Sequence, residues 1–171
     1  MAVGFPAKTS FTDGSVLPAS DLNDITGTLN SLVPTSSLPW TTYTPTISGG
    51  WANTGATPGT FGYAKYTQIG KVVFFAFDFT IGATTTKGTT LTVSLPVTSA
   101  STATMSNLRG IASIGGTVYD MTWFGSSTST ITGAAYSATG SYTIRTGITS
   151  AIPGSWATGD IFRAQGFYEA A

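Results

Sequence analysis

Between Gly70 and Gly82 the sequence reads Lys-Val-Val-Phe-Phe-Ala-Phe-Asp-Phe-Thr-Ile, a β-branched and aromatic run that is apolar on both faces. Successive side chains of a strand point to opposite sides, so a strand with one solvated face should alternate apolar and polar residues. Here one face is apolar from Val73 to Ile81, and Asp78 interrupts the other. Because both faces need cover, we expect a core on one side and a neighbouring copy or a second sheet on the other.

The composition indicates a rigid β-rich protein without an electrostatic partner. Only 8% of the 171 residues are charged, against about 25% in an average globular protein. The seven basic and seven acidic residues are scattered, so we expect no nucleic-acid partner. The longest apolar run is far shorter than the about 20 residues that span a bilayer, and the first residues do not resemble a signal peptide. We therefore expect no membrane insertion and a soluble chain made in the cytoplasm.

Residues 1–38 differ in pattern from the rest, and we expect an arm, a helix and a linker there. The helix is predicted to begin near Pro18 and to end before Pro34. An apolar stripe follows one side of it, formed by Leu22, Ile25, Leu29 and Leu32. Spacings of three, four and three residues are typical of a coiled-coil seam. The stripe either docks on its own domain or packs with two other copies about a common axis.

Residues 39–171 are predicted to form a mainly β domain, an antiparallel β-sandwich with jelly-roll-like character. Short apolar segments are separated by Gly, Ser and Thr turns, without an intervening helical pattern. A tight hairpin is predicted at Gly70. The predicted strands are residues 43–48, 61–69, 72–81, 91–95, 108–114, 117–124, 130–136, 142–145 and 161–168.

The sequence lacks the residues that most enzyme mechanisms require. Without His or Cys there is no Ser-His triad, no thiolate nucleophile and none of the usual zinc sites. Among the carboxylates, Asp78 stands out in an apolar strand, where we expect a partner such as Arg109 or Arg163. We therefore predict a protein that is not an enzyme, with no catalytic, cofactor-binding or metal-binding residues.

Loop aromatic residues offer a candidate ligand site. Trp51, Asn53 and Trp156 lie in stretches rich in Gly, Ser and Thr, a combination suited to stacking on sugar rings. The alternative is that each Trp fills the end of the sandwich or a seam between copies. Trp123, within a predicted strand, is expected in the core, and Trp40 is expected where the helix and the sandwich meet.

Several segments resemble virion proteins of tailed bacteriophages. The opening Gly-Phe-Pro-Ala-Lys and the later Phe-Thr-Asp-Gly-Ser-Val-Leu-Pro-Ala-Ser-Asp-Leu-Asn resemble amino-terminal segments of tail-fibre and minor tail proteins. The β-rich domains of the same proteins are similar to residues 40–47, 62–75, 91–97 and 166–170. The resemblance implies a homotrimer with an amino-terminal attachment region and a carboxy-terminal β-domain.

From this resemblance we expect a structural component of a virion, a trimeric tail fibre or tail-associated appendage. Its amino-terminal region would bind other virion proteins, and loops 49–59 and 153–158 would face the host surface, with a glycan as candidate ligand. A head-decoration protein that clamps capsid subunits is the first alternative. A polysaccharide depolymerase is the second, and it would require two carboxylates facing each other across a groove.

Overall fold

The computed structural model describes residues 39–106, 108–139 and 142–171. In these residues the one helical element is the short 3-10 helix η1, Thr102–Met105. The predicted helix of residues 18–33, with Leu22, Ile25, Leu29 and Leu32, lies outside the described residues. The strands are β1 (Thr41–Thr42), β2 (Ile47–Ser48), β3 (Ala52–Asn53), β4 (Thr60–Ile69), β5 (Val72–Thr80), β6 (Thr85–Thr86), β7 (Thr92–Ser94), β8 (Leu108–Ile114), β9 (Thr117–Gly125), β10 (Thr130–Thr139), β11 (Tyr142–Gly147) and β12 (Ile161–Glu169).

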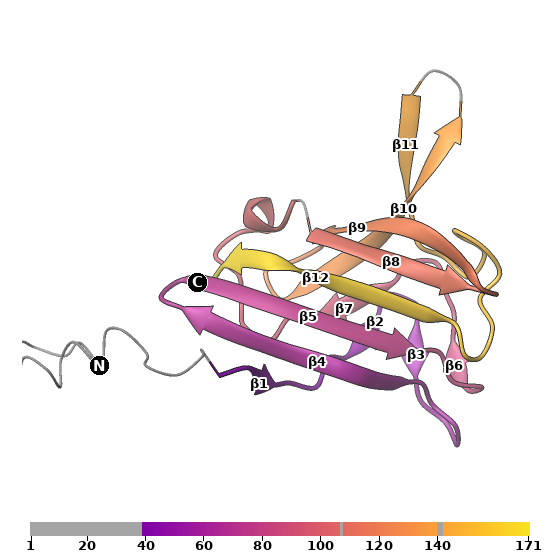
Figure 1. Cartoon of the computed structure of the whole chain (residues 1–171), viewed down its shortest axis with the longest axis horizontal. Coiled ribbons are helices and arrows are strands. Elements are labelled where there is room, and N and C mark those ends of the chain that lie inside the picture. The colour runs from indigo at the N-terminus through magenta and orange to yellow at the C-terminus, as the bar shows by residue number, and fades with distance from the viewer. Residues whose placement is uncertain (1–38, 107, 140–141) are drawn as a thin grey trace, which may run out of the picture. The chain divides into compact units, whose positions relative to one another are not determined.

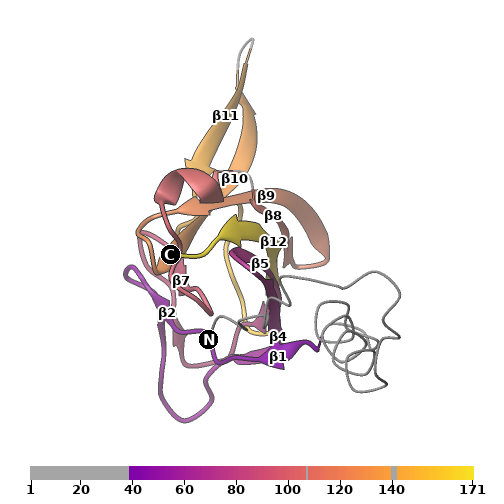
Figure 2. The ribbon, with the colours of Figure 1, turned by 90° about the vertical axis from the view of Figure 1, so that its left-hand side faces the viewer.

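Ten of these strands form one antiparallel sheet, which confirms a mainly β fold. Its order is β1-β4-β5-β12-β8-β9-β10-β7-β2, with β11 paired to β10, while β3 and β6 form a separate pair. The long strands β4, β5, β12 and β8 lie side by side, and the β10–β11 hairpin projects away from them (Figure 1). The sheet curls, so that β7 and β2 lie on the opposite side of the interior from β5 (Figure 2).

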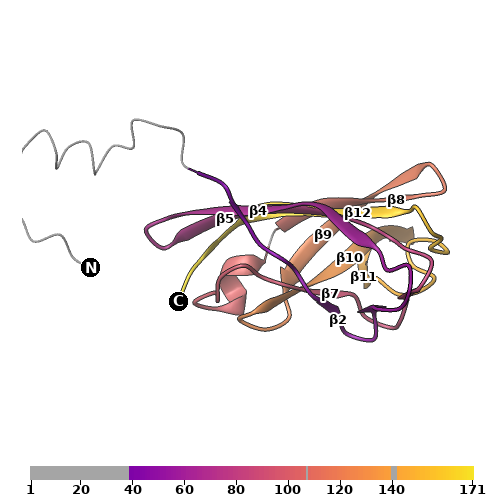
Figure 3. The same cartoon turned by 90° about the horizontal axis from the view of Figure 1, so that it is seen from below.

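The predicted strand of residues 43–48 is shorter than expected. Only its last two residues, in β2, form a regular strand, while β1 forms just before it and the N–H of Tyr43 still donates to the carbonyl of Ala64 in β4 at 3.1 Å. Pro45 stands between them and has no N–H to donate to a ladder. The chain instead crosses from the β4 edge of the sheet to the β7 edge, as seen from below in Figure 3.

The inward face of β5 begins the core. Val73, Phe75, Phe77 and Phe79 are all buried, as the alternation of the sequence predicts. Trp123 is fully buried, which confirms its predicted core position, and its ring meets that of Phe77 at a centroid distance of 5.5 Å. Aromatic contacts of this kind continue along the interior, so the curled sheet encloses one continuous core.

Two turns bring the long strands into register. Gly70 forms the tip of the β4–β5 hairpin with a φ of 58°, a conformation that glycine adopts without strain, and this confirms the predicted hairpin. At the other end of the sheet, the buried carboxylate of Asp160 accepts hydrogen bonds from the backbone N–H groups of Gly115 (3.0 Å) and Ala157 (2.6 Å). Asp160 thereby joins the β8–β9 turn to the loop that precedes β12.

Candidate interaction surface on the outer face

Trp51 and Trp156, the predicted ligand aromatics, lie in the interior. Their exposed fractions are 2% and 6%, and their rings meet edge to face at 5.6 Å. Both also pack against Phe162 of β12, with ring centroids 6.4 Å apart for Trp51 and 6.2 Å apart for Trp156. The indole N–H of Trp156 donates to the carbonyls of Thr149 and Ile152 at 3.0 and 3.1 Å. This burial favours the alternative that each Trp fills the end of the sheet.

Asn53 holds its own loop together. Its side-chain amide donates to the carbonyl of Gly59 at 2.9 Å, and its Oδ1 accepts from the Gly59 N–H at 2.7 Å. The hydroxyl of Thr85 also donates to this Oδ1, at 3.2 Å. These hydrogen bonds use both ends of the Asn53 side-chain amide and connect the loop to strand β6. The exposed part of the loop is residues 54–58.

We call the side of β4, β5, β12 and β8 that is turned away from the core the outer face. It carries large apolar side chains that are not buried in the core. Strand pairing places its residues in rows that run across the strands. Most of the large apolar side chains that remain exposed in the described residues lie on this face. They are Trp40, Tyr63, Ile69, Val72, Phe74 and Phe167, while exposed Val118 lies on the neighbouring strand β9.

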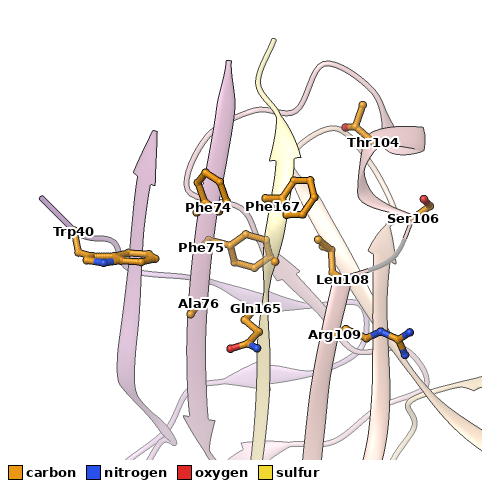
Figure 4. A pocket seen from close by; sticks show the side chains of 11 residues that line it. Trp40, Phe74, Phe75, Ala76, Thr104, Ser106, Leu108, Arg109, Gln165 and Phe167 are labelled. Carbon is orange, nitrogen blue, oxygen red and sulfur yellow. The ribbon is translucent and has the colours of Figure 1, made fainter. Parts of the chain in front are cut away.

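Three of these side chains form an aromatic row, Trp40, Phe74 and Phe167. Phe74 and Phe167 are direct cross-strand partners, and their ring centroids lie 5.8 Å apart. Trp40 precedes β1. Together with Phe74 and Phe167 it lines an open hollow of about 590 Å³ (Figure 4). The exposed fractions are 48% for Trp40, 38% for Phe74 and 63% for Phe167. The aromatic row therefore presents large apolar area to solvent.

The rows beside the aromatic row differ in character. Ile69 and Val72 are paired at the β4–β5 hairpin end and extend the apolar surface with aliphatic side chains. On the opposite side of the aromatic row from Ile69 and Val72, Gln165 of β12 is the cross-strand partner of Arg109 of β8. Both side chains also line the hollow of about 590 Å³. The outer face thus changes from aliphatic through aromatic to polar along the strand direction.

Farther along the strands lies a charged row. Arg163 of β12 is the cross-strand partner of both Asp78 and Ile111, and Ile111 is in turn the partner of Asp120. A second open hollow, of about 570 Å³, is lined by Asp78, Arg163 and Arg109 among others. Both arginines that the sequence suggested as partners therefore line the same hollow as Asp78, and Arg163 is its cross-strand neighbour.

The carboxylate of Asp78 has a structural contact of its own. Its Oδ1 accepts a hydrogen bond from the backbone N–H of Tyr63 at 2.8 Å, where the β4–β5 register shifts between Thr60 and Tyr63. A β-bulge leaves an extra residue outside the regular ladder, and a side-chain acceptor can bind its free N–H. Asp78 therefore stabilises the bulge.

The outer face is suited to contact with another macromolecule. It is built on regular strands, so its side chains are held in a fixed pattern, and it joins an apolar centre to a polar margin. In the part of the chain that the structure describes, no group of three or more metal-ligating side chains is present. The described residues also contain no helix long and apolar enough to cross a membrane.

A search for similar proteins found none: no family model, no curated protein and no solved structure matches the chain.

Sequence reasoning identified only part of the outer face. It predicted that the second face of β5, with Phe74, needs cover, but it did not single out Phe167. The signal was present in the alternation of β12, where Arg163, Gln165 and Glu169 share the outward register with that one phenylalanine. Phe167 gains its significance from pairing with Phe74 across the strands, because contiguous exposed apolar side chains mark interaction surfaces and single ones do not.

Proposed function

We propose that this protein is a structural component of a bacteriophage virion, a homotrimeric tail fibre or tail-associated appendage. Residues 1–38 attach it to the particle, and the β-domain projects outward, where its exposed loops face the host surface. We also propose to class the curled sheet as a jelly-roll-like β-sandwich. In support, the β2 end of the sheet folds back over its middle: Trp51, which follows β2, packs against Phe162 of the central strand β12.

The exposed aromatic row carries this proposal. The interior of the β-domain is already filled, so Trp40, Phe74 and Phe167 are not needed to complete the core of one copy. Full burial of one such side chain contributes about 1.5–3 kcal/mol relative to leaving it exposed. A chain with only 8% charged residues also has few charges to keep such a surface soluble. Assembly into a particle removes this surface from water.

The exposed loops, and not the two tryptophans, are proposed to contact the host. Trp51 and Trp156 are enclosed, so their ring faces are not open to a sugar ring. The exposed residues 54–58 offer Thr, Gly, Ala and Pro at the loop tip instead. A host-surface glycan remains the ligand class to be tested with this loop.

The test is to locate the chain in the particles of the phage that encodes it. Density for three copies at the tail, with adsorption reduced when the chain is deleted, is the expected result. Density on the capsid surface, with weakened heads and normal adsorption, would instead assign it to head decoration. Release of reducing sugar from host polysaccharide by the purified protein would support the depolymerase alternative.

A further inference from the structure

We propose that the outer face of β4, β5, β12 and β8 packs against the same face of further copies of this chain, with the aromatic row at the centre of the contact. This inference names the contact surface of the proposed homotrimer and therefore rests on it. Three observations favour a copy of this chain over another occupant.

The first observation is the mixture of apolar side chains. The aromatic row continues directly into Ile69 and Val72, so aliphatic and aromatic groups form one exposed surface. Sugar rings stack on aromatic faces, but aliphatic side chains offer them no such face. A protein surface of similar apolar character covers both kinds of side chain, as in the buried centres of homo-oligomer interfaces.

The second observation is the balance of charge. Three cationic and two anionic side chains lie in the outward register of these four strands, and Asp120 of the adjoining β9 brings the charges to three of each sign: Lys65, Arg109, Arg163, Asp78, Glu169 and Asp120. A strongly basic or acidic partner would leave half of these charges facing like charges. A surface with the same balance can meet each charge with its opposite, and a second copy supplies that surface.

The third observation is the place where residues 1–38 join the domain. Trp40, the first member of the aromatic row, follows them directly in sequence, with only Pro39 between. If three amino-terminal segments associate about one axis, the short chain connection favours an arrangement in which the three Trp40 residues lie near that axis. The face that carries Trp40 is then the face that the copies turn toward one another.

The absence of cysteine permits a direct test. The full-length chain has no Cys, so a single introduced thiol reports on one position only. The probe variants are Phe167→Cys and Gln165→Cys, the second of which keeps the aromatic row intact. Ala56→Cys, in the exposed loop away from the outer face, is the matched control. Each variant is oxidised, or treated with a short bismaleimide, and separated under denaturing conditions, while its native mass is measured in parallel.

We expect most of the chain with Cys at position 165 or 167 to shift to a covalent dimer, because two of three copies can be joined by one cross-link. The Ala56→Cys control should remain a monomer under denaturing conditions. A trimeric native mass without cross-links at either outer-face position would overturn this inference and leave the homotrimer standing. A monomeric native mass would overturn both.

Discussion

At the scale of single residues, Tyr168 joins the core to the loop that follows β7. Its ring is buried, its hydroxyl donates to the carbonyl of Val97 at 2.7 Å, and the N–H of Val97 donates back to it at 3.2 Å. One side chain thus satisfies both backbone groups of a residue far away in sequence.

We expect Tyr168→Phe to lower the free energy of unfolding by about 1–3 kcal/mol, because both groups of Val97 lose their partner. Tyr136→Phe, at an exposed position of β10, is the control and should change stability by less than about 0.5 kcal/mol. Urea denaturation of the two variants measures the difference. Equal stabilities would show that the hydroxyl of Tyr168 contributes nothing.

Buried tyrosines also predict how stability depends on pH. Burial raises the pKa of Tyr168 to about 12, although the hydrogen bond from the Val97 backbone opposes the shift. Burial likewise raises the pKa of Tyr43, with a smaller contribution from Tyr168. Above about pH 10 the unfolded chain releases these protons while the folded chain retains them.

The free energy of unfolding should therefore be constant with respect to these groups below pH 10 and should fall as the pH rises toward 12. Denaturation at pH 9 and pH 11 measures the fall. The double variant Tyr43→Phe with Tyr168→Phe starts from a lower stability and should lose less between the two pH values. A fall of the same size in this variant and in the native chain would contradict the assignment.

At the scale of elements, β8 and β12 approach closely at Gly110. A Cβ atom on this residue would lie 2.0 Å from the carbonyl oxygen of Arg163 and 2.6 Å from Nε1 of Trp123. These two atoms are joined by a hydrogen bond of 3.1 Å. The glycine leaves the space through which the buried indole reaches the neighbouring strand.

We expect Gly110→Ala to destabilise the protein by about 3 kcal/mol, because the methyl group overpacks this space and disturbs the Trp123 hydrogen bond. Gly147→Ala in β11 is the matched control, because a methyl group there would meet no atom within 4 Å beyond its own chain neighbours. Its effect should stay within about 0.5 kcal/mol. Thermal unfolding compares the two, and a mild effect at Gly110 would refute the close packing described.

The elements most accurately predicted from sequence are those whose pattern is local. The run in β5 and the hairpin at Gly70 combine β-branched or aromatic residues with a turn residue, and the structure confirms both. The two-residue strands β1, β3 and β6 were missed, because such short pairs form only where the tertiary fold brings two segments together. For Trp51 and Trp156 the sequence left both a ligand role and a position at the end of the sandwich open, because Gly- and Thr-rich flanks are typical of loops, whether or not the loop folds inward; the structure places both residues in the interior.

At the scale of the whole molecule, the domain has a filled interior and an apolar exterior face. Phe167 and Val118 both lie on the outward side of the sheet, with exposed fractions of 63% and 61%. Only Phe167 belongs to the aromatic row. The two residues therefore separate the effect of that row from the effect of exposed apolar area in general.

We expect Phe167→Ser to weaken association of the full-length chain by at least about tenfold, which corresponds to about 1.4 kcal/mol. Val118→Ser should leave association unchanged, and both variants should keep the fold of the native chain. The mass at a series of concentrations measures the effect. Equal effects of the two substitutions would contradict a specific role of the aromatic row.

The central claim is that copies of this chain cover the outer face that one copy leaves exposed. The native mass of the full-length protein in solution, measured by light scattering at micromolar concentration, tests it most directly. We predict three times the 17.5 kDa of a single chain. A mass of one chain at every concentration would contradict the claim.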